Sequence, residues 1–248
     1  MKISKQRLSV LVLALMALPL GNAANALPEA QPILIELFTS EGCSSCPAAD
    51  SYLSELRKSN CNVILLGEHV DYWNNLGWKD PFSSSIWTQR QKSYCQKLGA
   101  SSCYTPQTVI NGQRECVGSN QAAVQKAISE TSGSLKATVD LRLLKQKANS
   151  VDISVAVKNT SRANNLEIFL VEDGVLVNVP RGENGGRQLA HDGVVRAHAV
   201  IKSIKSGIVS SASLPQNPAA PSRNFRVVAL LEDENGPIGA AQQALPNR

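Results

Sequence analysis

The sequence predicts two domains of different class, an α/β domain over residues 27–133 and an all-β sandwich over residues 134–248. In the first half, short apolar runs alternate with helical patterns, whereas the second half contains only strand-like alternation between loops. The composition changes at the same point, since all six cysteines and nine of the eleven aromatic residues lie before residue 117. We therefore place the domain boundary near residues 132–134.

The first 26 residues are typical of a secretory signal peptide. Three basic residues within the first seven precede an apolar run from Leu8 to Leu20, and small residues follow up to Ala26. The run is shorter than the ~20 residues that span a bilayer. We expect cleavage after Ala26, a secreted or periplasmic protein, and no membrane partner after cleavage.

The net charge argues against nucleic acid as a partner. Loss of the three basic residues of the signal peptide would leave 22 basic and 20 acidic side chains. A nearly neutral surface without a block of Lys or Arg provides no electrostatic footprint for nucleic acid or an anionic membrane. We exclude both classes of partner.

The first half begins with a strand, a helix and a second strand. Ile33–Phe38 is a short apolar run that ends in turn-forming residues, which favours a buried strand. Pro47–Lys58 places Leu53 and Leu56 on one helical face behind an N-terminal proline. Val63–Leu66 is again short and apolar, so we predict that it forms the second strand.

A second helix, a hairpin and a third helix follow. Pro81–Leu98 is mostly helical in pattern and stops at Gly99, a residue typical of helix C-termini. Residues 108–110 and 115–117 flank an Asn-Gly pair, which is the usual signal of a tight hairpin turn. Asn120–Glu130 has the pattern of the last helix.

The second half consists of strands separated by loops rich in Asn, Gly, Pro and Ser. The strand patterns cover Lys136–Leu144, Val151–Lys158, Leu166–Val171, Val194–Ile204 and Phe225–Glu232. Several spaced strands over roughly 110 residues, with no crossover helix between them, fit an immunoglobulin-like sandwich better than a parallel sheet.

Cys43 and Cys46 lie where the first strand leads into the first helix. The positive end of a helix dipole and its free N–H groups stabilise a thiolate, which is the nucleophile in disulfide exchange. A gap of two residues lets the second thiol attack a mixed disulfide on the first. We expect an exposed, attacking Cys43, a resolving Cys46, a protein or small-thiol disulfide as partner, and no cofactor.

This Cys-Ser-Ser-Cys pair, together with Thr105-Pro106 before the third strand, resembles the thioredoxin superfamily in element order over residues 32–132. The resemblance implies a thioredoxin-like domain at 27–133. It also implies a cis Thr105–Pro106 bond, with both residues lining a substrate groove next to the cysteines.

Three phrases are similar to a family of exported bacterial proteins that have a thioredoxin-like domain and no assigned function. They begin at Leu37, His69 and Arg181, and read LFTSEGC, HVDYW and RGEN. The similarity covers nearly the whole mature chain. The glycine-rich stretch Arg181–Arg196 belongs to it. This stretch either packs between the domains, which we favour, or forms a long solvated loop.

Three further residues are candidates for proton transfer at the cysteine pair. His69 and Asp71 follow the second strand, where His69 can exchange a proton with Cys43 or stabilise its thiolate and Asp71 can orient the ring. Glu36 lies in the first strand, where a buried carboxyl can accept the proton of Cys46. The alternatives are that His69 is an ordinary loop histidine and that Glu36 is a surface carboxylate at the end of its strand.

The aromatic residues between the second strand and the next helix include Trp73 and Trp78. They form either an apolar wall for a substrate or part of the core. Cys95 and Cys103 flank Gly99 and are candidates for a structural disulfide that braces the loop before Thr105.

Other functions remain open for the cysteine pair. It is either redox-active, a plain structural disulfide, or half of a zinc site, although no second CxxC or His pair at zinc spacing occurs. We therefore predict no metal site. The alternative functions are a soft-metal carrier that binds Cu(I) through both thiolates, and a non-catalytic binding scaffold.

Overall fold

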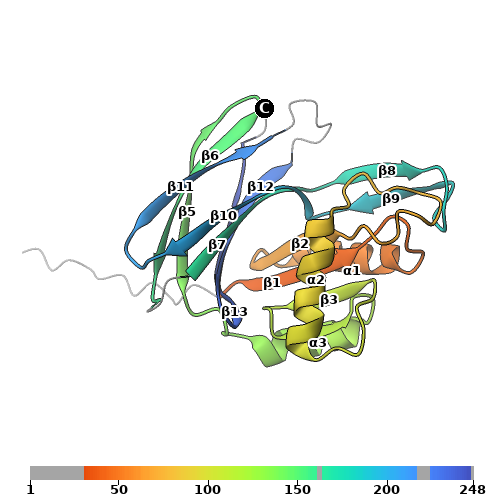
Figure 1. Cartoon of the computed structure of the whole chain (residues 1–248), viewed down its shortest axis with the longest axis horizontal. Coiled ribbons are helices and arrows are strands. Elements are labelled where there is room, and N and C mark those ends of the chain that lie inside the picture. Colours follow the sequence, from red (N-terminus) through yellow and green to blue (C-terminus); the bar gives the residue numbers. More distant parts are fainter. Residues whose placement is uncertain (1–30, 161–163, 217–223, 247–248) are drawn as a thin grey trace, which may run out of the picture.

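The computed structural model of the protein describes residues 31–160, 164–216 and 224–246. The expected signal peptide, residues 1–26, lies outside the described residues. The described part of the chain is mostly β-strand and contains three short helices (Figure 1). None of these helices has the length and the apolar character needed to cross a membrane.

The largest element is a mixed sheet of eight strands in the order β13-β12-β7-β10-β2-β1-β3-β4 (Figure 1). The strands are β1 (Ile33–Thr39), β2 (Val63–His69), β3 (Gln107–Ile110), β4 (Arg114–Val117), β7 (Asn164–Glu172), β10 (Val194–Ile204), β12 (Phe225–Asp233) and β13 (Gly236–Ala244). β2 pairs in parallel with both β1 and β10, and the other neighbours are antiparallel.

The predicted fold class, a thioredoxin-like α/β domain followed by an immunoglobulin-like sandwich, is wrong. Strands from both halves of the chain form one sheet, because β2 of the first half pairs with β10 of the second. The Gly67 amide donates to the Gly193 carbonyl at 2.6 Å. Gly193 has φ +80°, and a Cβ there would lie 2.9 Å from the Leu65 carbonyl oxygen, so the close approach requires glycine.

The three helices lie on the two faces of the large sheet. α1 (Cys46–Ser59) and α3 (Gln121–Thr131) pack on one face, against a core that includes Ile35 and Leu37 of β1. α2 (Ser85–Leu98) packs on the other face, where Trp87 meets Leu34 of β1 and Phe169 of β7. Neighbouring residues of a strand point to opposite faces, so β1 is buried on both sides.

A three-stranded sheet in the order β11-β6-β5 packs on the far end of the large sheet (Figure 1). Its strands are β5 (Thr138–Gln146), β6 (Ser150–Lys158) and β11 (Val209–Pro215). Alternate residues of β6 are buried against β7 and β12. The boundary expected at residues 133 and 134 falls between α3 and β5, and the large sheet has strands from both sides of it.

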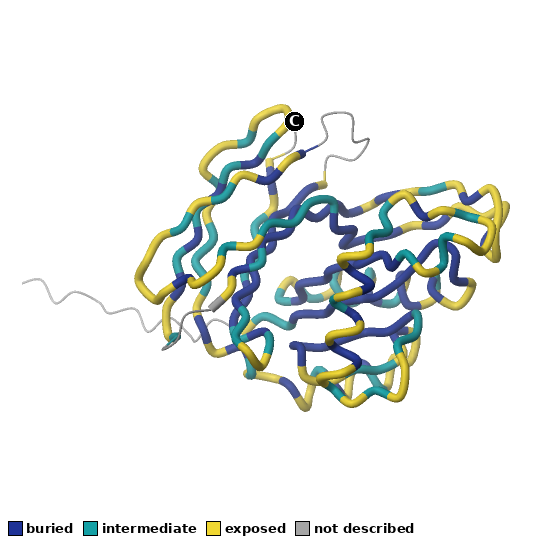
Figure 2. Tube along the Cα trace, in the orientation of Figure 1, coloured by how far each residue is buried: buried dark blue, intermediate teal, exposed yellow. Residues whose placement is uncertain are grey.

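A two-stranded hairpin, β8 (Val175–Val179) and β9 (Arg187–His191), extends past the N-terminal end of α1 (Figure 1). Neither strand was predicted from the sequence. Figure 2 shows mostly buried residues along the central strands and a largely exposed tip on this hairpin. The predicted hairpin at β3 and β4 is confirmed, and its turn residues Asn111 and Gly112 have φ of 48° and 65°.

Candidate functional site

Cys43 and Cys46 form a disulfide between β1 and α1, with their Cα atoms 5.5 Å apart. The Cys46 amide donates to the Cys43 carbonyl at 3.2 Å, which closes a tight turn around Ser44 and Ser45. α1 begins at Cys46 with Pro47 in its first turn. The disulfide therefore lies at the N-terminus of this helix, where free N–H groups favour negative charge on sulfur.

Both cysteines are buried, and the expectation that Cys43 is exposed is wrong, because each residue is only 1% exposed. The turn of the β8–β9 hairpin, residues 180–186, packs on the backbone of the cysteine loop, and we call it the covering loop. The side-chain amide of Asn184 donates to the Glu41 carbonyl at 2.8 Å and to the Cys43 carbonyl at 2.9 Å. The Ser44 amide donates to the Glu183 carboxylate at 2.9 Å.

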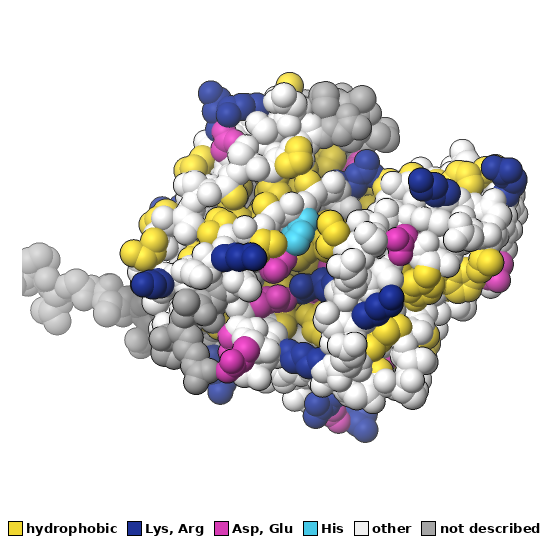
Figure 3. Space-filling view, in the orientation of Figure 1, with side chains coloured by type: hydrophobic (Ala, Val, Ile, Leu, Met, Phe, Trp, Pro, Cys, Tyr) yellow, Lys and Arg dark blue, Asp and Glu magenta, His cyan; other side chains and the backbone are white. Residues whose placement is uncertain are grey.

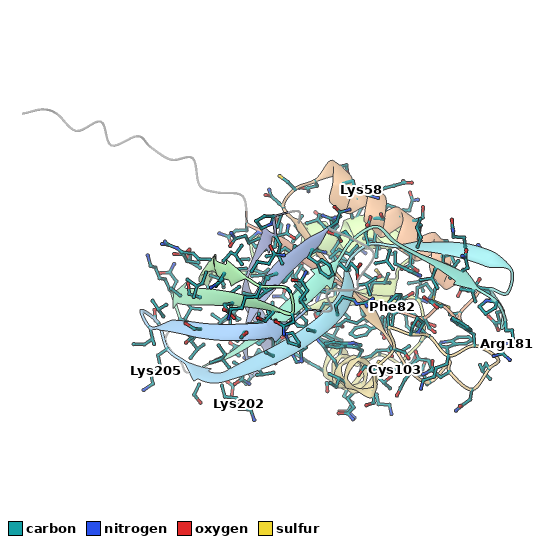
Figure 4. The ribbon with its side chains drawn as sticks, turned by 90° about the horizontal axis from the view of Figure 1, so that it is seen from above. Lys58, Phe82, Cys103, Arg181, Lys202 and Lys205 are labelled. Carbon is teal, nitrogen blue, oxygen red and sulfur yellow. A yellow bond between two sulfur atoms is a disulfide. The ribbon has the colours of Figure 1, made fainter. Side chains whose placement is uncertain are left out.

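The covering loop also contacts the aromatic segment that follows β2. A Cβ on Gly182 would lie 3.3 Å from the Cβ of Trp78, so the two segments approach closely. Figure 4 shows Arg181 at the outer end of the molecule, opposite the end that carries Lys202 and Lys205. The cover over the disulfide is thus held at several points but belongs to the periphery of the fold.

Trp73 connects the cysteine loop to the segment before β3. Its indole N–H donates to the Thr105 hydroxyl at 2.9 Å, and a Cβ on Gly42 would lie 3.1 Å from the Trp73 Cβ. The Thr105–Pro106 peptide bond is cis, as the resemblance implied. Pro106 is buried and Thr105 is half-buried. Trp73 thus links Thr105 to Gly42, the residue next to Cys43.

Glu41, two residues before Cys43, is fully buried. The Trp78 indole donates to its carboxylate at 2.6 Å, and its backbone amide donates to Asp80 at 2.9 Å. Burial and the nearby charge of Asp80 raise the pKa of Glu41 above its usual value. This carboxyl group therefore holds a proton more readily than an exposed glutamate.

Two buried histidines lie beside Glu41, each bound to an aspartate. His69 Nδ1 is 2.7 Å from Asp80, and His191 Nδ1 is 3.2 Å from Asp50. The two rings are in edge contact with centroids 5.1 Å apart, and His191 Nε2 is 3.9 Å from the Glu41 carboxylate. Within the described residues, neither Nε2 atom has a hydrogen-bond partner, and neither does Glu41 Oε1.

The charges of this cluster shift the pKa values of its members. Burial alone lowers the pKa of His69, but the adjacent carboxylates, above all Asp80, raise it overall. Burial raises the pKa of Asp80, but the charge of His69 and three hydrogen bonds lower it overall. The pair is thus stabilised as an imidazolium and a carboxylate.

Among known proteins, a family model matches residues 34–232. The chain belongs to the DUF1223 family. The family is described as proteins of unknown function. None of the curated proteins matches the chain. The match agrees with the expected similarity to a family without an assigned function, but the thioredoxin part of that resemblance is not confirmed.

The solved structure of protein AGR_C_4864 from Agrobacterium tumefaciens is similar to this DUF1223 chain, with 24% identity and a TM-score of 0.65. The alignment covers 90% of this chain and 100% of that one, so the two proteins share a fold. A domain of the outer membrane lipoprotein Omp28 from Porphyromonas gingivalis has 15% identity over 43% of this chain and 85% of its own, with a TM-score of 0.26.

The structure does not bring all of the predicted proton-transfer residues of the DUF1223 chain to the disulfide. Asp71 accepts a hydrogen bond from Thr88 at 2.6 Å, and it is Asp80 that binds His69. Glu36 points to the α2 face of β1, away from α1, and accepts hydrogen bonds from Arg90 and Tyr94. Asp80 was not predicted from the sequence, because it lies eleven residues after His69 in an irregular loop.

Asp50 and His191 were also missed as site residues. Asp50 lies four residues after Cys46 on α1, so both side chains point to the same side of the helix. It accepts a hydrogen bond from the Thr39 hydroxyl at 3.2 Å as well as contacting His191. His191 ends β9, a strand that the sequence pattern did not reveal.

The other four cysteines behave in two ways. Cys95 and Cys103 form the predicted disulfide, with Cα atoms 5.8 Å apart. Cys61 and Cys116 are free, the first exposed and the second partly buried. Burial and the neighbouring Glu115 raise the pKa of Cys116 to about 11.

Among the described residues, no group of three or more His, Cys, Asp or Glu side chains is arranged to hold a metal ion.

Proposed function

We propose that this protein exchanges disulfides with a protein or small-thiol partner through Cys43 and Cys46, in an exported compartment. The observation that carries the proposal is a two-residue-spaced disulfide at a helix N-terminus, next to a buried cluster of titratable groups. Two disulfides in one chain and the apolar run after the basic N-terminus support an oxidising, exported location.

The exchange is a two-electron reaction that needs no cofactor. A partner thiolate attacks the Cys43 sulfur, a new sulfur–sulfur bond forms, and Cys46 leaves as a thiolate. A second partner thiolate then displaces Cys43, so the partner is oxidised to a disulfide and the cysteine pair is reduced. The reverse sequence, in which the Cys43 thiolate attacks a partner disulfide, transfers the same two electrons the other way.

The buried cluster provides protons for this exchange. Each departing thiolate is neutralised by one proton, and Glu41 holds a proton readily because burial raises its pKa. His191 bridges from Glu41 to Asp50, which lies one turn beyond Cys46 on α1. We assign His191 and Asp50 as positioning residues that connect Glu41 to the Cys46 side of the disulfide.

The covering loop must move before a partner reaches the sulfur atoms. Cys43 is 1% exposed, and nucleophilic attack on a disulfide requires approach along the sulfur–sulfur axis. The contacts to be broken are the two hydrogen bonds from Asn184 and the one to Glu183. Net contributions of about 1 kcal/mol for each such bond leave opening thermally accessible.

The test is trapping of a mixed disulfide in a chain whose two other free thiols are replaced by serine, at Cys61 and Cys116. In this background Cys46→Ala leaves Cys43 without its resolving partner, and oxidised glutathione is the probe. We expect a single glutathione adduct on Cys43 by mass spectrometry. The matched control, with Cys43→Ala added, should form none.

The outcomes separate the candidate functions. An adduct on Cys43, together with insulin reduction by the otherwise unmodified chain in the presence of dithiothreitol, supports disulfide exchange. Absence of both reactions contradicts it. If the reduced chain then binds Cu(I) tightly through both thiolates, the soft-metal carrier replaces our proposal; if it binds none, the pair is structural in a scaffold.

A further inference from the structure

The second disulfide, between Cys95 and Cys103, has no role in the proposed function. Cys95 lies in the last turn of α2, and Cys103 lies in the loop that follows Gly99. Figure 4 shows Cys103 beside α2, which is seen end-on in that view. Cys103 is half-buried and Cys95 is 7% exposed, whereas both cysteines of the first disulfide are 1% exposed. Cys103 is therefore the most accessible of the four disulfide-bonded cysteines.

The loop that carries Cys103 is held to the fold by bonds other than the disulfide. The side-chain amide of Gln91 on α2 donates to the Tyr104 carbonyl at 2.7 Å. The Tyr104 hydroxyl donates to the Glu115 carboxylate of β4 at 2.5 Å. When the disulfide opens, these bonds keep Cys103 close to α2, so the pair can close again without refolding of the chain.

Cys95 lies against a buried amide that suits a thiol better than a disulfide. Its sulfur is 3.5 Å from the side-chain oxygen of Gln107, a fully buried residue of β3. A disulfide sulfur has no hydrogen to donate, whereas the thiol of a reduced Cys95 can donate to this oxygen. The Gln107 amide is fixed in this orientation because it donates to Glu115 at 2.9 Å and accepts from Gln91 at 3.0 Å. The reduced state therefore gains a hydrogen bond that the oxidised state lacks.

The surface over α2 carries charges of both signs. Figure 3 shows acidic and basic side chains mixed on this face, and Lys92 and Lys97 are exposed on α2 itself. Lys97 lies two residues after Cys95 in the last turn of the helix. A small thiol such as glutathione, which itself carries both signs of charge, can approach such a surface without net repulsion.

We propose that Cys95–Cys103 is a second exchangeable disulfide, which a small thiol opens at Cys103 and which Gln107 stabilises in its reduced state. The thiolate of the small molecule attacks the Cys103 sulfur and forms a mixed disulfide there. Cys95 leaves as a thiolate, takes up a proton from water and donates a hydrogen bond to Gln107. A second small thiolate attacks the small-molecule sulfur of the mixed disulfide and releases Cys103. Two small thiols are thus oxidised to one disulfide, and the cysteine pair gains two electrons and two protons.

The first test measures reduction by glutathione of the full chain with Cys61→Ser and Cys116→Ser. Reduced thiols are alkylated with iodoacetamide, and the peptides that contain Cys95 and Cys103 are quantified by mass spectrometry. Because Cys103 is accessible in the folded chain, we expect the same rate in water and in urea below the unfolding transition. A disulfide that reacts only after global unfolding would react roughly fivefold faster, or more, for each molar of urea. That result, or no reduction of the folded chain, overturns the proposal.

The second test identifies the attacked sulfur in the same background. Cys95→Ala leaves Cys103 as the free thiol, Cys103→Ala leaves Cys95, and oxidised glutathione is the probe. Near-ultraviolet circular dichroism checks that both variants are folded. We expect the glutathione adduct on Cys103 to form roughly tenfold faster than the adduct on Cys95, because thiol exchange depends on access to the sulfur. Equal rates, or a faster adduct on Cys95, overturn the proposal.

The third test concerns the hydrogen bond in the reduced state. Gln107→Met keeps the length of the side chain but removes the acceptor for the Cys95 thiol. We expect this variant to lower the equilibrium constant for reduction of Cys95–Cys103 by glutathione roughly twofold or more. Gln113→Met, at an exposed position in the turn between β3 and β4, is the matched control and should behave like the wild type. A folded Gln107→Met protein with the wild-type equilibrium constant overturns the proposal.

Discussion

The side-chain amide of Asn184 donates a hydrogen bond at 2.9 Å to the carbonyl of Cys43, a residue 141 positions earlier in the chain. The same amide group binds the Glu41 carbonyl. One side chain at the turn of the β8–β9 hairpin thus holds the backbone on which the disulfide is built. Access to the sulfur atoms and the conformation of the cysteine loop are therefore coupled to a single peripheral hairpin.

We expect Asn184→Ala to accelerate attack on the Cys43–Cys46 disulfide. The substitution removes two hydrogen bonds that hold the covering loop closed, together about 1–2 kcal/mol, which corresponds to roughly five- to thirtyfold more open form. The measurement is the rate of reduction by glutathione, followed by mass spectrometry of alkylated protein. Gln188→Ala, which removes only an exposed contact to Asn178 in the same hairpin, is the control and should leave the rate unchanged. Equal rates in all three proteins would contradict the claim that the covering loop limits access to the disulfide.

The His69–Asp80 pair should stabilise the fold more strongly in mild acid than in alkali. The pKa of His69 is raised in the folded protein above the ordinary value of about 6.5. Its contribution is therefore fully present below the ordinary pKa and is lost as pH rises through the folded pKa. In urea unfolding, the stability of the wild type minus that of His69→Gln should fall between pH 6 and pH 9.

Asp80→Asn provides the control for this pH dependence. The Asp80 carboxylate is the main group that raises the pKa of His69. In the Asp80→Asn background, the stability lost on replacing His69 should therefore change less with pH. If the stability of the wild type minus that of His69→Gln instead grows with rising pH, burial has a larger effect on the pKa of His69 than the carboxylates. That result would contradict the raised pKa of His69.

Arg90→Met should destabilise the protein more than any surface charge substitution. It leaves Glu36 and Glu68 buried without their cation, and breaking a buried ion pair costs about 3–5 kcal/mol at neutral pH. Their pKa values are already raised, so the loss should shrink toward pH 4 as both carboxyl groups take up protons. Arg114→Met, which affects only the exposed Glu130, is the control and should change stability little. If the stability lost in Arg90→Met does not depend on pH, the loss comes from packing and not from the buried charges.

The two free cysteines should differ sharply in reactivity. Cys61 is exposed, whereas burial and Glu115 raise the pKa of Cys116 to about 11. Since only the thiolate reacts, Cys116 should carry ~100-fold less of it at pH 8 than a thiol with a pKa near 9. Iodoacetamide without reductant should give one adduct, absent in Cys61→Ser and retained in Cys116→Ser. Rapid modification of Cys116 would show that it is not shielded.

Local patterns in the sequence predicted the three helices of the described residues and many of the strands. The apolar runs at β1 and β2, the helix behind Pro47 and the Asn-Gly turn at residues 111 and 112 all have the predicted structure. These features depend on neighbours within a few residues, so sequence spacing reports them directly. The same reasoning identified Cys43, Cys46 and His69 as site candidates, whereas Thr105 was a candidate only through the resemblance to the thioredoxin superfamily.

The chain by itself thus determined its local elements, its cysteine pairs and its β-rich second half. Only the tertiary structure decided that β2 pairs with β10 across the expected domain boundary, and that Asp50, Asp80 and His191 gather beside Glu41. Strand pairing and charge clustering depend on contacts between residues far apart in sequence. A single sequence carries no signal for such contacts, because each strand's apolar face is equally compatible with many partners.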